Sequence, residues 1–310
     1  MAVALLAPLP RRERVSNQSV KAAVTGAGLL VAVALAGVAI FLTAQGWPAW
    51  WAGSAELPMG AKSLWSLALP LAFGSVWAAL LALVMAAPIA IAAALCITMY
   101  MPRSVGRFLG AVVDVLAAIP SVVYGLWGLM VLAPILAKGY TWLGENAGWF
   151  PLFSGRASAS GRTIFTAAVV LAIMIMPIMA AICREVFQQT PTSATEAAQA
   201  LGATRWEMIR LAVFPFARSG MISGAMLALG RALGETMATA MLISPVPFLI
   251  SISLTSSSNP NTIAAFIAQN FPEAHGIEVS ALIALGLVLF AITFVVNALA
   301  RRIAASGVKS

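Results

Sequence analysis

Residues 193–215, SATEAAQALGATRWEMIRLAVFP, form a polar interruption between two long apolar blocks of the sequence. Ser193-x-x-Glu196 and Thr204-x-x-Glu207 each fit a capping box, in which a hydroxyl and a carboxylate accept hydrogen bonds from free backbone amides at a helix start. Gly202 stands where the first helix should stop, because glycine adopts the left-handed conformation at a helix end without a steric penalty. Pro215 then opens the next apolar block. The stretch predicts two short helices, joined at Gly202 and held at a membrane surface.

The composition is that of a polytopic, all-α membrane protein. Of the 310 residues, 61% are hydrophobic and 9% are charged, whereas a soluble domain averages about 25% charged residues. Cys96 and Cys183 lie in or beside apolar segments and match no metal or redox spacing, so we expect them to be packing residues. His275 is the single histidine, and a histidine-based metal site or catalytic triad is therefore excluded.

Six apolar stretches each approach or exceed the roughly 20 residues needed to cross a bilayer. The second is too long for one untilted crossing, and Pro70 and Pro88 inside it predict an extra interfacial turn or a kink. The expected spans are 22–44, 66–100, 108–137, 163–185, 216–243 and 279–300. The expected segments are a tail over 1–20, a first span with its outer loop over 21–65, a core over 66–303 containing the loop 190–215, and a tail over 304–310.

The Lys and Arg residues divide unequally between the two sides that this topology defines. With the amino terminus inside, 13 lie inside, namely Arg11, Arg12, Arg14, Lys21, Arg103, Arg107, Arg184, Arg205, Arg210, Arg218, Arg301, Arg302 and Lys309. Only 4 lie outside, namely Lys62, Lys138, Arg156 and Arg162. The positive-inside rule therefore predicts that both termini and the 193–215 stretch are cytoplasmic. The net charge of +8 then reports topology, and we expect no binding to nucleic acid.

The outer loops are too short to hold a folded ligand-binding domain. The third is rich in Ser, Asn and Pro around residues 256–261 and then turns apolar. Asn261 or Thr262 can cap a short helix there.

Three charged residues fall inside the expected spans: Asp114, Arg231 and Glu235. An arginine at a helix centre costs about 2.5–3.5 kcal/mol on insertion scales, so such residues usually face a pore or a partner. Asp114 lies a turn or two from the cytoplasmic end of its span and could instead reach the lipid headgroups. We take all three as candidates for a substrate path.

Arg231 and Glu235 are four positions apart, which on a continuous helix places them within about 40° of each other on one face. Gly220-x-x-x-Gly224 and Gly230-x-x-x-Gly234 make the same helix narrow enough for close helix packing. The pair could be an internal ion pair that matters only for assembly. Alternatively, the guanidinium fork could bind a tetrahedral oxyanion, with Glu235 orienting Arg231 or moderating its grip.

The sequence holds no nucleotide-binding loop of its own. Gly60-Ala61-Lys62-Ser63 lacks the adjacent Gly-Lys pair, the upstream spacing and the preceding strand of such a loop. The chain is therefore not expected to hydrolyse ATP, and no catalytic residues are assigned to it.

The 193–215 stretch resembles the "EAA" loop of ATP-binding-cassette importer permeases, whose pattern is EAA-x3-G-x9-I-x-L-P. Glu196, Ala197, Ala198, Gly202 and Pro215 keep its spacing in full. This chain has Ala212 and Phe214 where the family usually has Ile and Leu, and both substitutions remain apolar. In that family the loop docks into a groove on a separate ATPase subunit and transmits its closure to the membrane helices.

Two further motifs narrow the resemblance. Residues 230–237, GRALGETM, followed by Ala238, and residues 119–128, IPSVVYGLWG, are similar to the C-type, or PstC, family of phosphate importer permeases. Sulfate and molybdate permeases carry a similar R-A-x-G-E core, so Arg231 and Glu235 alone indicate an oxyanion. The resemblance covers most of the chain from about residue 66 to residue 302.

The resemblance implies the type I importer (MetI-like) core and a bacterial inner-membrane location. It also implies a heterodimer with a sister permease, a cytoplasmic ATPase dimer that carries ATP and Mg²⁺, and an external phosphate-binding protein. Arg231 and Glu235 would serve the anion path, and the 193–215 loop would couple it to the ATPase. Two rivals remain open: a secondary transporter with Asp114 and Glu235 as a proton relay, and an anion channel.

Overall fold

The computed structural model describes residues 11–306, and this part of the chain is built from helices and contains no strand. Six of its helices are long and apolar enough to cross a membrane: Ser19–Trp50, Leu64–Tyr100, Ser121–Ala147, Ile164–Gln188, Arg205–Leu233 and Ile277–Arg302. The expected fold class, an all-α polytopic membrane protein, is confirmed.

The elements in chain order are α1 (Arg11–Gly46), η2 (Trp47–Trp50), η3 (Pro58–Gly60), α2 (Leu64–Leu95), η4 (Cys96–Tyr100), α3 (Arg103–Ala117), α4 (Ser121–Trp127), η5 (Gly128–Leu132), α5 (Ala133–Ala147), η6 (Pro151–Phe153), α6 (Ile164–Gln188), α7 (Thr192–Ala200), α8 (Arg205–Met208), η7 (Ile209–Val213), α9 (Phe214–Leu233), α10 (Met237–Leu242), α11 (Ile263–Asn270) and α12 (Ile277–Ser306). The segments η4, η5 and η7 are single π-helical turns that continue the helices beside them.

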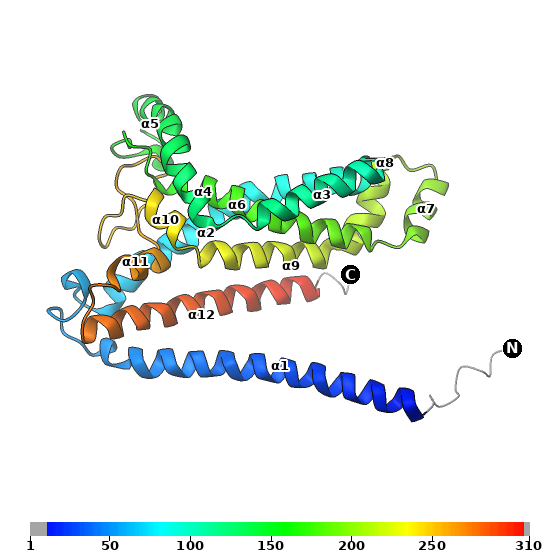
Figure 1. The fold of residues 1–310 in the computed structure, drawn as a ribbon. Helices are drawn as coiled ribbons and strands as arrows, with labels where there is room; N and C mark the ends of the chain where they lie inside the picture. The colour runs from blue at the N-terminus through cyan, green and yellow to red at the C-terminus, as the bar shows by residue number, and fades with distance from the viewer. Residues whose placement is uncertain (1–10, 307–310) are drawn as a thin grey trace.

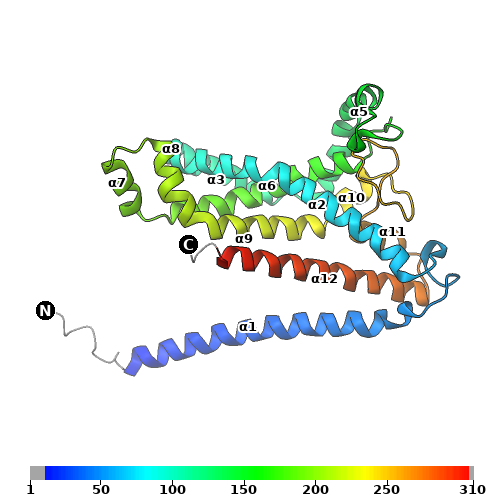
Figure 2. The same ribbon diagram turned by 180° about the vertical axis from the view of Figure 1, so that it is seen from behind.

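Helices α1, α2, α3, α6, α9 and α12 run along the bundle, whereas α5 projects away from it at one end and the short α7 and α8 lie at the other (Figure 1). We call the end with α7 and α8 the loop end, and the end with α5, α10 and α11 the opposite end. The start of α1 and the end of α12 both point toward the loop end, as the reverse view also shows (Figure 2). Helix α3 begins at Arg103 and α8 begins at Arg205. Both starts lie at the loop end, as the charge asymmetry predicts.

The core lies between α2, α6 and α9. Every fourth residue of α2 from Ala78 to Ala94 is an alanine with at most 1% of its surface exposed, so α2 presents a smooth stripe to α6. Gly220 and Gly224 do the same for α9, because their missing side chains make room for Val186 and Ile182 of α6. The first small-xxx-small motif is thereby confirmed as a packing motif.

Helix α1 packs only along part of α12, with Gly46 seated against Ala284, and its apolar side chains such as Leu30 and Val33 are exposed. Exposed apolar surface on a membrane helix suits contact with lipid. The helix begins at Arg11, earlier than the expected start of the span at residue 22. No proline lies between Pro10 and Pro48, so the helix also includes the polar residues 11–21 before the expected span. Residues 1–10 lie outside the described part of the chain.

Two expected spans are wrong in their limits. The predicted span 108–137 breaks, because α3 ends at Ala117 and α4 begins at Ser121. Pro120 causes the break, since it offers no backbone N–H and disfavours a helical residue before it. The helix of this region that is long and apolar enough to cross a membrane is instead Ser121–Ala147. The predicted span 216–243 also breaks, because α9 ends at Leu233 and only the short α10 follows.

The second apolar stretch and the third outer loop also carried expectations about their helices. The long second stretch remains one helix from Leu64, capped by Ser63, and holds Pro70 and Pro88 in its interior without a separate interfacial turn. The short helix in the third outer loop is confirmed as α11, whose N-cap Thr262 accepts a hydrogen bond from the N–H of Ala265.

Buried polar contacts fasten that loop to the bundle. The N–H of Ile263 donates to Ser75 Oγ of α2 at 2.8 Å, and the N–H of Ile164 donates to Asn259 Oδ1 at 2.9 Å. Asn259 and Ser75 are at most 2% exposed. The opposite end is therefore a fixed part of the fold.

Candidate functional site

The first half of the 193–215 stretch forms α7, but its predicted capping box is wrong. The helix begins after Pro191, two residues earlier than expected, and no side chain caps it. Pro191 presets a φ of −58° just before the helix, which favours this early start. Ser193 therefore lies inside the helix. Glu196 is exposed and has no hydrogen bond within residues 11–306, so its carboxylate is available to a partner.

Gly202 ends α7 as predicted. Its φ is +85°, a left-handed value that residues with a side chain rarely adopt. The N–H of Gly202 donates to the carbonyl of Gln199 at 2.9 Å, and the N–H of Ala203 donates to that of Ala198 at 3.1 Å. These two bonds form a Schellman motif, which sets the direction in which the chain leaves α7.

The second capping box is confirmed. Thr204 Oγ1 accepts from the N–H of Glu207, and Glu207 Oε2 accepts from the N–H of Thr204 at 2.8 Å. From there α8, η7 and α9 form one helix that turns a corner near Pro215. The part before the corner runs across the loop end, and α9 runs along the bundle (Figures 1 and 2).

This crossing segment is anchored to the bundle. Met208, Ile209 and Val213 are buried, and the ring of Phe214 lies between those of Trp206 and Phe187, with centroids about 6 Å away. Arg205 lies over the ring of Tyr100 at 5.9 Å. Phe214, one of the two residues that depart from the family pattern, thus ties the loop to α6.

An exposed apolar surface on the loop was not anticipated from the sequence. Leu201 is 89% exposed, and Trp206 and Leu211 are more than half exposed. Leucine between Ala200 and Gly202 reads as an ordinary helix-end residue, so the sequence alone gives no signal for it. Glu196 and Ala197 of the same loop are also exposed. Exposed large apolar side chains are typical of sites that bind another protein.

Arg231 lies in the last turn of α9 and is exposed on this chain. It has no ion-pair or hydrogen-bond partner among the described residues. Nothing lies within 4 Å of the position where a side chain at Gly230 would begin. Within residues 11–306 the second small-xxx-small motif therefore packs against no other helix, and the space beside Gly230, the residue before Arg231, is open.

The expectation that Glu235 shares a helical face with Arg231 is wrong, because α9 ends between them with Gly234 as its C-cap. Glu235 is 8% exposed, and its Oε1 accepts a hydrogen bond from the N–H of Ala238 at 3.1 Å. Thr239 Oγ1 donates to the Glu235 carbonyl at 2.9 Å. These polar groups satisfy backbone atoms that the helix break frees inside the membrane region.

Asp114 is held at a different place. It forms an ion pair with Arg184 of α6, with an N–O distance of 2.9 Å and a second oxygen at 3.0 Å. The absent side chain of Gly110 makes room for that guanidinium. The structure therefore places Arg231 and Glu235 on either side of one helix break, and joins Asp114 to Arg184 instead.

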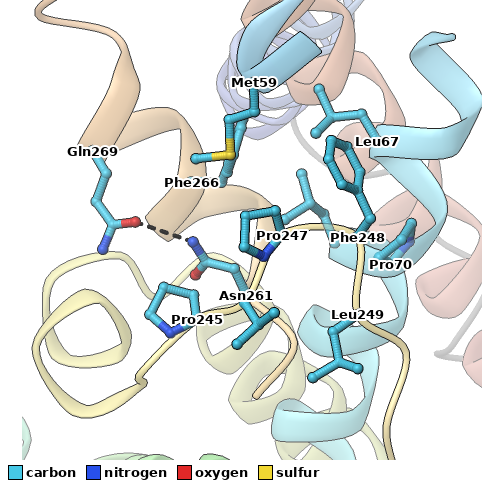
Figure 3. Close-up of a pocket in the computed structure, with 12 residues that line it drawn as sticks. Met59, Leu67, Pro70, Pro245, Pro247, Phe248, Leu249, Asn261, Phe266 and Gln269 are labelled. Carbon is cyan, nitrogen blue, oxygen red and sulfur yellow. Dashed lines mark hydrogen bonds between the residues drawn. The ribbon is translucent and has the colours of Figure 1, made fainter. Parts of the chain in front are cut away.

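A separate pocket of about 60 Å³ lies at the opposite end. Figure 3 shows its lining of prolines and large apolar side chains, with Asn261 hydrogen-bonded to Gln269 at 3.0 Å. It presents no charged group, so it does not suit an oxyanion.

The chain resembles known transport proteins over nearly its full length. Residues 86–306 match the family model described as "Binding-protein-dependent transport system inner membrane component". The phosphate transport system permease protein PstC 2 of Mycobacterium tuberculosis is 42% identical, covering 97% of this chain and 95% of that protein. PstC of Mycobacterium leprae is 44% identical over 86% of each chain, and PstC of Mesorhizobium japonicum is 39% identical, covering 94% of this chain and 90% of that protein.

Two solved structures show the same fold at low sequence identity. The MetNI methionine ABC transporter matches with a TM-score of 0.56 at 14% identity, over 78% of this chain and 96% of that one. A bacterial ABC transporter for alginate import matches with a TM-score of 0.53 at 18% identity, over 76% and 79%. The chain therefore belongs to the family of binding-protein-dependent transport system inner membrane components, in the branch of the PstC permeases.

Proposed function

We propose that this chain is the membrane permease subunit of an ATP-driven importer that moves inorganic phosphate into the cytoplasm. The observation that carries the proposal is Arg231, an exposed and unpaired guanidinium in a membrane helix beside open space. Such a group is costly unless it meets an anion or a partner, and its fork matches a tetrahedral oxyanion. The relatives named phosphate permeases make phosphate the preferred anion, and sulfate or molybdate is the alternative.

Energy would come from a separate ATPase dimer bound at the loop end, which carries ATP and Mg²⁺. The exposed surface of Glu196, Ala197 and Leu201 suits such a contact, and Gly202 directs the chain from that contact into the helix that ends near Arg231. A sister permease would cover the open side of Arg231. An external phosphate-binding protein would dock on the opposite end. The loop end and both termini would be cytoplasmic.

A proton-coupled secondary transporter is less well supported. The relay it requires uses Asp114 and Glu235, but Asp114 is engaged by Arg184 and Glu235 caps α10. Neither carboxylate is then free to pass a proton to the other.

The test is phosphate uptake into proteoliposomes that contain the purified complex. Uptake should require ATP and no proton gradient, and excess sulfate should not compete. Arg231→Gln should abolish uptake while the complex still assembles, and Arg231→Lys should be intermediate, because lysine keeps the charge but loses the fork. Arg218→Gln removes the same charge from the other end of α9 and should be near normal. Uptake driven by a proton gradient without ATP, or normal uptake by Arg231→Gln, would overturn the proposal.

A further inference from the structure

Arg231 shares its open space with a polar side chain from another helix. A cavity of about 460 Å³ is lined by Ile178 of α6, Met226, Leu227, Gly230 and Arg231 of α9, and Asn297 of α12. The other lining residues are apolar or glycine, so Arg231 and Asn297 alone give this cavity hydrogen-bonding side chains. They come from two helices that pack side by side (Figure 1).

The surroundings of Asn297 give its amide no other use within the chain. Asn297 is exposed, and within residues 11–306 its side chain has no hydrogen-bond partner. Its exposed neighbours on α12, Phe294, Val295 and Leu299, are large and apolar. A primary amide among the exposed apolar side chains of a membrane helix carries a desolvation cost unless a polar group meets it. The cavity that leads to Arg231 is where such a group can lie.

The chemistry of phosphate matches this pair. Near neutral pH inorganic phosphate carries both charged oxygens and at least one hydroxyl. Arg231 supplies donors only, whereas an amide supplies two N–H donors and one carbonyl acceptor. Asn297 Nδ2 can therefore donate to a phosphate oxygen while its Oδ1 accepts from a phosphate hydroxyl. Sulfate lacks a hydroxyl at this pH and cannot make the second bond.

We infer that Asn297 is a second anion-contacting residue of the phosphate path, hydrogen-bonding the ion that Arg231 attracts. The inference rests on the proposed function and adds a residue from α12 to it. The loss of one hydrogen bond to a charged group corresponds to about a ten- to hundredfold change. Removal of the amide should lower transport within that range without disturbing the loop or the docking ends.

The experiment compares three variants of the full complex in proteoliposomes with its ATPase and binding protein. Asn297→Leu keeps the branched shape, with a somewhat larger side chain, and removes both bonds, whereas Asn297→Ser keeps a donor and an acceptor. Thr293→Val is the matched control on the same helix, because the Thr293 hydroxyl bonds the carbonyl of Phe290 in its own turn. The readouts are phosphate uptake, ATP hydrolysis stimulated by the loaded binding protein, and yield of assembled complex.

Asn297→Leu should cut phosphate moved per ATP hydrolysed at least tenfold, with stimulated hydrolysis and complex yield retained. Asn297→Ser should recover a substantial part of transport, and Thr293→Val should match the wild type. Equal uptake by the leucine and serine variants, normal uptake by the leucine variant, or loss of the assembled complex would overturn the inference. Absence of ATP-dependent phosphate uptake by the wild type would instead refute the proposed function itself.

Discussion

Substitution of Gly202 tests how the loop conformation supports coupling. The residue has a φ of +85° and no atom within 4 Å of the position of a new Cβ. Alanine at this position therefore meets no clash and costs only the backbone term, about 1–2 kcal/mol for a left-handed residue with a side chain. Since 1.4 kcal/mol is a factor of ten, the closed Schellman turn should become about five- to thirtyfold less favoured.

The direct readout is hydrogen exchange at residues 202 and 203, whose amides donate to the carbonyls of Gln199 and Ala198. Gly202→Ala should speed their exchange about five- to thirtyfold, with a smaller loss of ATP-driven uptake. Gly202→Val should be more severe in both assays, because a β-branched residue tolerates a positive φ poorly. Membrane insertion should survive, since the turn lies outside the bundle.

Gly139 of α5 provides the control. It also has nothing within 4 Å, but its conformation is helical, so Gly139→Ala should be neutral or slightly stabilising. Unchanged exchange in Gly202→Ala would refute the energetic argument. Normal uptake by the valine variant would show that the loop is only a connector.

Three further predictions use other features of the molecule. In a variant without Cys96 and Cys183, single cysteines introduced at Lys138 and Ser257 should react with a membrane-impermeant thiol reagent added from outside, whereas cysteines at Arg103 and Thr204 should not. Labelling from outside at Thr204 would invert the proposed orientation. Asp114→Asn should reduce uptake less than about fivefold, because its partly exposed ion pair with Arg184 contributes at most about 1 kcal/mol. Abolished uptake would assign Asp114 to the anion path. Glu235→Gln should preserve the thermal stability of the purified complex, since the glutamine amide oxygen can still accept the hydrogen bond from the N–H of Ala238. Glu235→Ala should lower stability by about 1 kcal/mol. Equal stability of the two variants would exclude the capping role.

The features that the sequence predicted well are those determined by a few neighbouring residues. Thr204 and Glu207 are three positions apart and satisfy each other, and Gly202 ends a helix because of its own backbone freedom. The outline of the six membrane helices follows from apolar length in the same way. Ser193 misled the prediction, because Pro191 starts α7 earlier and leaves Ser193 in its first turn.

The parts that could not be predicted depend on tertiary contacts or on breaks inside apolar sequence. Hydropathy stays high through Pro120 and recovers soon after Gly234, so the apolar length alone does not show that the helices stop there. The separation of Glu235 from the face of Arg231 follows from the second break. Arg184 lies 70 positions from Asp114, and Asn297 lines the same cavity as Arg231 only because α12 returns beside α9.

Because the helix bends near Pro215, the segment before the bend and α9 can act as the short and long arms of one lever. Arg231 lies 17 residues beyond Phe214, about 25 Å along the axis at about 1.5 Å per residue. A movement of the segment before the bend that tilts α9 by about 5° would displace the Arg231 guanidinium about 2 Å sideways. A hydrogen bond forms only over a window of about 0.5 Å in distance, so under the proposed function a tilt of this size would be enough to make or break the hydrogen bonds between Arg231 and an anion. Binding and release of the anion would then require no rearrangement of the Arg231 side chain, only a change in the tilt of α9.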